Sequence, residues 1–268
     1  MSGPVLLVGC GKMGGAMLEG WLARSLLSDG VHLVEPSADA IAAFRGKPGV
    51  TSHASLDALP ADLTPEIVVL AVKPQTTPEV LPKLARFKAA TFLSIMAGKK
   101  IAGLSSALGG APIVRSMPNT PAAVGRGMTV AVAGPGVTPA ARKRCDDLLA
   151  AVGEVAWVED EGLIDPVTAV SGGGPAYVFL LIEALAAAGE KAGLPADLAM
   201  RLARVTVSGS GELARLSSEP AAQLRKNVTS PGGTTLEALK VLMADDGIQP
   251  VFDRAIAAAT RRAGELGS

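Results

Sequence analysis

The sequence predicts an α/β domain over residues 1–162, followed by an all-helical domain over residues 163–268. Three observations favour this division. Short apolar runs alternate with helical stretches in the first part, a glycine-rich turn joins the first such pair, and β-type runs stop after about Glu161. Strand–helix alternation is typical of a parallel sheet wound by helices. We place the boundary near residue 162, without a flexible linker.

The strands of the first domain are predicted from short runs of Val, Ile and Leu. Ile67–Val72 is apolar at every position, as expected for a strand covered on both faces. The other predicted strands are Val5–Val8, His32–Val34, Phe92–Ile95, Ile113–Val114, Met128–Ala133 and Val155–Val158. In the second domain, length and Ala and Leu content predict helices, separated by Gly or Pro, over Tyr177–Ala192, Ala196–Leu216, Thr234–Ala244 and Val251–Leu266.

The composition indicates a packed protein and argues against several classes of function. Hydrophobic residues make up 49% of the chain and charged residues 19%, which is too apolar for disorder. The 25 Lys and Arg balance the 25 Asp and Glu, so no net charge favours nucleic acid or an anionic membrane. Cys10 and Cys145 form no disulfide framework or metal-ligand spacing, as expected in a reducing compartment.

Neither a membrane span nor a targeting peptide is expected. The longest apolar runs, such as Ala176–Ile182, are much shorter than the roughly 18 residues that cross a bilayer. A strand pattern begins at about Pro4, which leaves no room for a signal or transit peptide. We therefore expect a cytoplasmic protein with no nucleic-acid, membrane or metal partner.

The turn after the first strand fits the pattern G-x-G-x-x-G. It comprises Gly9, Cys10, Gly11, Lys12, Met13 and Gly14. Because it follows a strand and opens a helix, the pattern indicates a Rossmann-like dinucleotide site and not merely an ordinary glycine turn. Gly9 allows the tight turn, Gly11 lets a pyrophosphate approach the backbone, and Gly14 lets helix and strand pack closely. The N–H groups that open the helix then face the phosphates.

The ends of three other strands supply further candidate cofactor residues. Glu35 follows the second strand, where an acidic residue typically binds the ribose 2′-hydroxyl and repels a 2′-phosphate. A solvated charge is the alternative, and neighbouring Ser37 has a hydroxyl that suits a phosphate, so the choice between NAD and NADP stays open. Ligands of open α/β sheets bind at the carboxyl ends of strands. This rule adds the strand ends Ala71, Val72, Lys73 and Pro74, and Ile95, Met96 and Ala97, although Lys73 also reads as a surface lysine.

The helical domain contains one turn that suits an anion. In Ser230–Glu237, a glycine turn feeds a predicted helix, and Thr234 with Glu237 has the spacing of a capping box. Such a turn also leaves N–H groups that attract a carboxylate, beside the hydroxyls of Ser230 and Thr235. The glycines of Ser171–Tyr177 are interpreted as structural, at a close-packed helix start.

The parts needed for nucleophilic or metal chemistry are missing from the sequence. The two histidines, His32 in a strand and His53 in a loop, are expected to be structural or exposed. No Ser-His-Asp set, H-E-x-x-H motif or Cys/His cluster occurs. Hydride transfer needs none of these motifs, because the cofactor carries the chemistry and the protein aligns the reacting carbons.

At these motifs the chain resembles the pyrroline-5-carboxylate reductases. Val228–Thr235 resembles their C-terminal signature, with supporting similarity at Ala71–Pro74, Arg115–Pro121 and Ser171–Tyr177, in family order across nearly the whole chain. Two departures are Gly173, where the family usually has Ser, and Glu35, where a small residue is common.

The resemblance implies reduction of L-1-pyrroline-5-carboxylate to L-proline with NADPH or NADH, the last step of proline biosynthesis. It places the cofactor on the glycine loop, Ala71–Pro74 and Ile95–Ala97. It implies that Thr235 lies near the ring nitrogen as the catalytic residue and that Ser230, Gly233, Thr234 and Thr235 bind the substrate. It also implies a C-terminal dimerisation domain and, in many members, assembly into decamers. We further expect an obligate homodimer, because the helices of this domain are apolar on more than one face.

Two rival functions stay open at this point. Hydroxyacid dehydrogenases of the 6-phosphogluconate type share the domain plan but need a helix-borne lysine; Tyr177–Gly189 has none, and Lys191 lies a turn further on. A dinucleotide sensor without activity would have no use for the Ser230–Thr235 turn. Independently of the resemblance, Val178–Ile182 is apolar around its whole helix, which predicts burial by a second copy of the chain.

Overall fold

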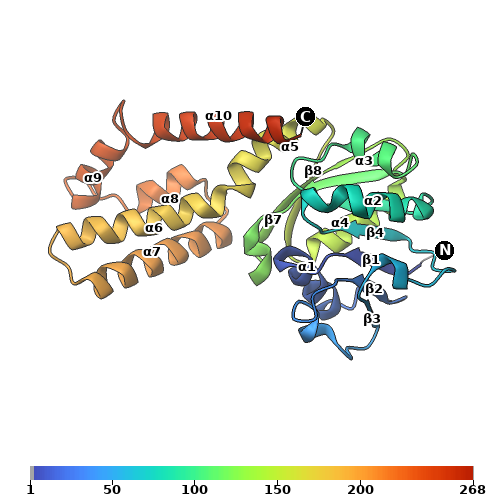
Figure 1. The fold of residues 1–268 in the computed structure, drawn as a ribbon. Helices are drawn as coiled ribbons and strands as arrows, with labels where there is room; N and C mark the ends of the chain where they lie inside the picture. Colours follow the sequence, from blue (N-terminus) through green and yellow to red (C-terminus); the bar gives the residue numbers. More distant parts are fainter. Residues whose placement is uncertain (1–2, 268) are drawn as a thin grey trace. The chain divides into compact units, whose positions relative to one another are not determined.

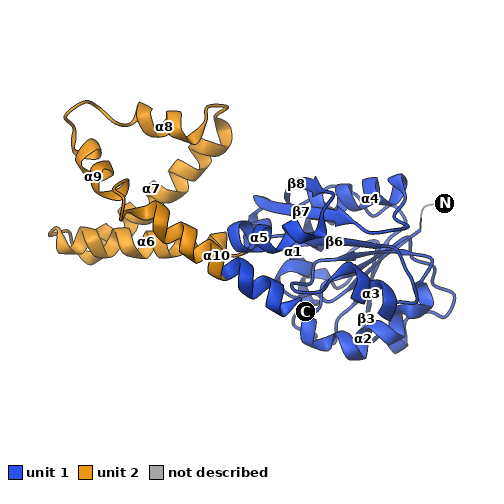
Figure 2. Ribbon diagram, turned by 90° about the horizontal axis from the view of Figure 1, so that it is seen from above, with its two compact units in different colours: residues 1–172, 259–268 blue, residues 173–258 orange. Residues whose placement is uncertain are grey.

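The computed structural model describes residues 3–267, which form two compact units (Figures 1 and 2). Unit 1 contains the described residues up to Gly172 and those from Ala259 onward, and unit 2 contains Gly173–Ala258. The boundary expected near residue 162 therefore lies inside unit 1, and the last predicted helix is divided between the units. The reason is that the end of this helix packs against the loop after β5. A Cβ at Gly98 in that loop would lie only 2.9 Å from the carbonyl oxygen of Leu266.

Unit 1 is built on an eight-stranded sheet of order β3-β2-β1-β4-β5-β6-β7-β8. Strands β1 to β6 are parallel and follow the order 3-2-1-4-5-6 of dinucleotide-binding domains. The strands are β1 (Val5–Val8), β2 (Val31–Val34), β3 (Val50–His53), β4 (Ile67–Leu70), β5 (Thr91–Ser94), β6 (Ile113–Met117), β7 (Gly127–Ala133) and β8 (Gly153–Val158). All seven predicted strands are confirmed.

The sheet is mixed and not wholly parallel, which corrects the sequence-based expectation. β7 runs antiparallel to β6, and β8 is parallel to β7. The connection between β6 and β7, Pro118–Arg126, carries only the short helix η5 (Thr120–Val124). A parallel crossover needs a dozen or more residues, so this connection can only reverse the chain.

Strand β3 was not predicted, and His53 therefore lies in a strand and not in a loop. β3 pairs with β2 alone, at the edge of the sheet, with Val34 opposite His53. Its sequence, Val-Thr-Ser-His, carries a single strongly apolar residue. Pairing with a neighbouring strand decides this element, because its own hydrophobic pattern is too weak to indicate one.

The sheet has a hydrophobic core on each face. Along β1, Val5 and Leu7 belong to one cluster, while Leu6 and Val8 belong to the other. The helices of unit 1 are α1 (Lys12–Ala23), α2 (Thr77–Leu84), α3 (Ile101–Ala107), α4 (Pro139–Ala150) and α5 (Ile164–Val167). Trp21 of α1 is fully buried and its indole N–H donates to the carbonyl of Leu148 in α4 at 2.8 Å, so this face packs without an unpaired donor.

Unit 2 is entirely helical, as predicted. Its helices are α6 (Gly174–Lys191), α7 (Ala196–Leu216), α8 (Ala221–Asn227), α9 (Thr234–Leu242) and α10 (Ile248–Leu266), the last of which continues into unit 1. The four predicted helices agree with α6, α7, α9 and α10 within a few residues. The short helix α8, which directly follows Pro220, was not predicted.

The helices of unit 2 leave most of their large apolar side chains exposed. Within α6 and α7, the buried residues are Ala186, Ala199 and Ala203. In contrast, Phe179 is 59% exposed, Leu180 62% and Val205 63%. A helix that is apolar all round needs cover on every side, and the described part of one chain does not supply it.

One helical segment has the length and composition of a membrane span. Glu161–Lys191 comprises 31 residues, with a mean hydropathy of 1.4 in its most apolar window and 11% of that window buried. The expectation that no segment is long enough was therefore wrong, because short apolar runs add up along one continuous helical stretch. A single such helix is weak support for a membrane span, since a helix covered by a partner has the same composition.

Candidate active site

The glycine loop has the geometry expected of a dinucleotide site. Gly9 has φ +99°, and a Cβ there would lie 2.6 Å from the carbonyl oxygen of Ala71. A Cβ at Gly14 would lie 2.3 Å from the carbonyl oxygen of Gly9. Both positions therefore exclude a side chain for reasons of packing.

Gly11 differs from its neighbours because it faces open space. A Cβ at Gly11 would meet no atom within 4 Å. Gly11 is also the N-cap of α1 and has no side-chain capping bond, so the first N–H groups of the helix face this space. The loop therefore fits a pyrophosphate held by backbone donors at a helix N-terminus. Lys12 is exposed beside it, while Met13 packs partly against the core.

Glu35 lies against this loop. Its Oε2 accepts the N–H of Cys10 at 2.8 Å, and its Oε1 accepts the N–H of Ser37 at 2.9 Å. The main chain of Glu35 is also bound, since its N–H donates to the carbonyl of His53 at 3.1 Å. The carboxylate is thus held in place beside the glycine loop, where the sequence predicts a group that meets the ribose.

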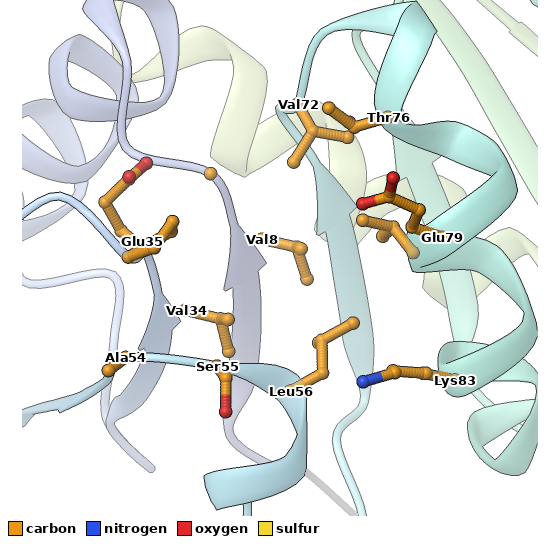
Figure 3. Close-up of a pocket in the computed structure, with 13 residues that line it drawn as sticks. Val8, Val34, Glu35, Ala54, Ser55, Leu56, Val72, Thr76, Glu79 and Lys83 are labelled. Carbon is orange, nitrogen blue, oxygen red and sulfur yellow. The ribbon is translucent and has the colours of Figure 1, made fainter.

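A pocket of about 340 Å³ adjoins Glu35 and reaches the first turns of α2 (Figure 3). This volume is at the lower end of small-molecule sites and suits one part of a dinucleotide. Its lining comprises Val8, Gly9, Val34, Glu35, Pro36, Ala54, Ser55, Leu56, Val72, Thr76, Glu79, Val80 and Lys83. In the close-up, Val8 forms the floor, while Glu79 and Lys83 point in from the opposite side to Glu35.

Much of this pocket is lined by residues that were not predicted from the sequence. Ala54, Ser55 and Leu56 follow β3, which was not predicted, and Thr76, Glu79 and Lys83 belong to the segment after Pro74. The available signal was the general rule that loops after parallel strands line the ligand site. Because β3 was not predicted, that rule did not point to Ala54, Ser55 or Leu56.

The other predicted cofactor residues follow β4 and β5. Val72 lines the pocket, whereas Lys73 is exposed and precedes the short helix η3 (Pro74–Thr76). After β5, Ile95 is half-buried and Ala97 is exposed. Met96 is only 2% exposed and its side chain packs in the core, so Met96 can offer a ligand its main chain alone.

The segment Arg115–Pro121 contributes structural contacts. Arg115 is 3% exposed and binds Glu161 at 2.9 Å and Asp165 at 3.5 Å. The amide of Asn119 donates to Ser171 and accepts the N–H of Met128 at 2.9 Å. Both side chains thus connect the carboxyl end of β6 to the segment that leads into α6.

The turn before α9 supports the predicted anion site, although not its predicted cap. α9 begins at Thr234, and its N-cap is Gly233, with no side-chain capping bond. The capping box of Thr234 with Glu237 was therefore wrong: Glu237 instead binds Lys240 at 2.7 Å. Since Thr234 is already the first helical residue, its side chain is past the position from which a cap can act.

The uncapped start of α9 is exposed and lies next to hydroxyl groups. Gly232 has φ +68°, and the N–H of Gly233 donates to the carbonyl of Ser230 at 3.1 Å, which closes the turn. A Cβ at Gly233 would lie 2.4 Å from Oγ of Ser230, so a side chain there would force this hydroxyl to turn away. Thr234 and Thr235 are both exposed. Free N–H groups and hydroxyl donors together favour a carboxylate.

The thiols and acids of the described residues offer no nucleophile or metal site. Burial, followed by the charges of Glu35 and Glu19, raises the pKa of Cys10 to about 11, so this thiol stays protonated at neutral pH. No group of three or more His, Cys, Asp or Glu gathers as a metal site within residues 3–267.

Comparison with known proteins agrees with both halves of this description. The family model described as NADP oxidoreductase, coenzyme F420-dependent, matches residues 4–98. The family model described as pyrroline-5-carboxylate reductase dimerisation matches residues 161–266. The first match covers the glycine loop and the pocket beside Glu35, and the second covers the uncapped start of α9.

Individual relatives extend this similarity over the whole chain. A pyrroline-5-carboxylate reductase of Pseudomonas aeruginosa is 38% identical over 99% of this chain and 98% of its own length. The solved structure of a pyrroline-5-carboxylate reductase from Coxiella burnetii has 33% identity and a TM-score of 0.91, with complete coverage of both chains. The Plasmodium falciparum enzyme, solved with NADP bound, has 30% identity and a TM-score of 0.79 over 99% of this chain and 98% of its own. This chain therefore belongs to the pyrroline-5-carboxylate reductase family of NAD(P)H-dependent oxidoreductases.

Proposed function

We propose that this protein reduces L-1-pyrroline-5-carboxylate to L-proline with NADPH or NADH, in the last step of proline biosynthesis. The observation that carries this assignment is the uncapped start of α9, where exposed Thr234 and Thr235 follow the closed turn at Ser230. A small cyclic amino acid needs a carboxylate site of this kind, and family membership supports the reaction. The hydroxyacid dehydrogenase alternative lacks support, since Lys191 is the last residue of α6.

The residues of the chain would bind and orient the two reactants. The N–H groups of Thr234 and Thr235 and the hydroxyl of Ser230 would bind the substrate carboxylate, and Gly233 leaves room for it. The hydroxyl of Thr235 would then donate to, or accept from, the ring nitrogen. Bound NAD(P)H supplies the hydride that adds to the carbon of the C=N bond, and the nitrogen gains a proton. Alignment of this kind accounts for a large share of the rate of such reactions.

The protein forms a homo-oligomer through its dimerisation domain. We propose in addition that the dimer is obligate and acts in the cytoplasm. A second copy would cover the apolar surface of α6 and α7, which also accounts for the apolar composition of Glu161–Lys191 without a membrane. Assembly of dimers into decamers stays a prediction of the family resemblance.

Reduction of pyrroline-5-carboxylate by the purified protein tests the proposal. We expect cofactor absorbance at the wavelength of the reduced nicotinamide to fall only when the imine is present, with proline as the product. Turnover of a hydroxy acid with NAD(P)+ and no turnover of the imine would support the hydroxyacid dehydrogenase. Cofactor binding without turnover of either compound would support a sensor.

A further inference from the structure

The carboxylate of Glu35 occupies two main-chain donors beside the glycine loop. At the end of β2, it accepts the N–H of Cys10 at 2.8 Å and that of Ser37 at 2.9 Å, so both of its oxygens have a main-chain partner. Pro36 has no N–H, so the N–H of Ser37 is the first main-chain donor after Glu35. In the described structure this group already serves a carboxylate, and a phosphate in its place would have to displace it.

The segment that follows β2 adds no positive charge. Between Glu35 and Ala40, the charged residues are Glu35 and Asp39, and there is neither Lys nor Arg. Recognition of a 2′-phosphate normally relies on an Arg near this position. The charge at the end of β2 is therefore negative, with no cation to balance it within the segment.

The pocket beside Glu35 also lacks a free positive charge for a phosphate. Its charged lining residues are Glu35, Glu79 and Lys83, and Nζ of Lys83 binds Oδ2 of Asp57 at 2.5 Å. The one ammonium group in the lining thus already has a carboxylate partner. In Figure 3, Lys83 also points in from the far side of the pocket from Glu35.

These charges affect the two cofactors differently. The 2′-hydroxyl of NADH can donate a hydrogen bond to a carboxylate, which is a strong, charge-assisted bond. A 2′-phosphate carries a charge of about −1.5 to −2 at neutral pH and has only acceptor oxygens, so it meets the carboxylate with repulsion and no donor. The same position therefore attracts one cofactor and repels the other.

We propose that Glu35 makes this enzyme prefer NADH over NADPH as its hydride donor. The proposal rests on the proposed function for the reaction, but the preference concerns cofactor binding alone. It distinguishes this chain from the NADP-bound relative and from the NADP description of the matching family model. Residues of the glycine loop, including Lys12, then have only a minor influence on the choice between NADH and NADPH.

The test compares cofactor affinity in wild type, Glu35→Gln and Glu35→Ser, by fluorescence titration of NADH and NADPH without substrate. We expect wild type to bind NADH at least tenfold more tightly than NADPH. We expect Glu35→Gln, which keeps the size and an acceptor oxygen but not the charge, to reduce that ratio at least tenfold. Glu154→Gln removes an exposed carboxylate of β8 and should leave the ratio unchanged.

Three outcomes would overturn the proposal. These are tighter binding of NADPH by wild type, an unchanged ratio in both Glu35 variants, or a Lys12→Ala variant in which the ratio changes more than in Glu35→Gln. Steady-state kcat/KM values with pyrroline-5-carboxylate should follow the same order. If the imine is not reduced with either cofactor, the proposed reaction fails, while the titrations still decide whether Glu35 selects the nucleotide.

Discussion

The three glycines of the first turn lack a side chain for different reasons, and only one of these reasons concerns the ligand. A Cβ at Gly9 would lie 2.6 Å from a backbone atom, and a Cβ at Gly14 would lie 2.3 Å from one, so substitution at either position would distort the fold. A Cβ at Gly11 would have no other atom within 4 Å, so a side chain there would extend into the space proposed for the pyrophosphate. Gly11 is therefore the position at which binding and stability can be separated.

Replacement of Gly11 by Val should weaken cofactor binding and leave the fold intact. A Cβ at Gly11 meets no atom within 4 Å, so the branched side chain would extend into the space in front of α1. We expect the cofactor Kd and KM to rise at least tenfold, with a Tm close to that of wild type. Gly103→Val is the matched control, because Gly103 of α3 also has open space at its Cβ. Unchanged cofactor affinity in a folded Gly11→Val protein would exclude the loop from the site.

Replacement of Thr235 by Ala should weaken the use of the substrate and leave cofactor binding unchanged. One hydrogen bond to a charged or polarised group contributes about 1.5–3 kcal/mol. Its loss corresponds to roughly a 10- to 150-fold decrease in kcat/KM for pyrroline-5-carboxylate. The cofactor Kd should not change. Thr235→Ser keeps the hydroxyl and should retain most activity, whereas near-normal kinetics of Thr235→Ala would leave Thr235 only a role in starting α9.

At the scale of elements, the pairing of β2 with β3 brings the two histidines together. Nδ1 of His32 and Nε2 of His53 lie 2.9 Å apart, and the rings are nearly parallel, at 8°. One ring must donate and the other accept, so the bond cannot survive protonation of both rings. The same strand end holds Glu35, whose N–H donates to the carbonyl of His53. The edge of the sheet thus connects the two histidines to Glu35, which lines the pocket.

The stability of this edge should decrease in mild acid. Burial, and next the charge of His53, lowers the pKa of His32 below its ordinary value of 6.5 in the folded protein. The unfolded chain therefore binds more protons than the folded one as the pH falls through about 6.5, and the free energy of unfolding falls with it. We expect Tm to decrease between pH 8 and pH 5.5 more in wild type than in His32→Thr. Parallel Tm profiles would show that His32 makes no contribution.

At the scale of the whole molecule, the exposed apolar helices require a second chain. The interface should be at the large, apolar end of the usual range, on the order of 2,000 Å² or more. We expect light scattering to show dimers or larger assemblies at every active concentration, and activity to disappear on dissociation. An active monomer would contradict the obligate dimer.

Mixed dimers test whether each active site combines two subunits. We expect the start of α9 to act with the nucleotide-binding domain of the other subunit. Co-expression of Gly11→Val with Thr235→Ala would then produce mixed dimers in which one of the two sites is intact. Random pairing should restore about one quarter of wild-type activity. If each active site lies within a single chain, every site in the mixture has one of the two substitutions. The mixture would then be no more active than the two single variants.

The sequence alone was sufficient for the elements whose residues are strongly patterned. β1 and β4 are apolar at every position, α7 has a clear length and proline boundary, and the glycine loop joins a strand to a helix. Local residues also predicted the glycine turn that leads into α9, although not the way this helix begins. Family membership also followed from such motifs.

Only the tertiary structure decided the features that depend on neighbours. β3 exists because β2 offers it a partner, and β7 reverses direction because its connection is short. The lining after β3, the paired donors of Glu35 and the uncapped start of α9 at Gly233 were equally beyond sequence patterns. Periodicity reports which side of an element is apolar, whereas pairing, reversal and hydrogen-bond partners depend on residues far apart in the chain, which meet only when the chain folds.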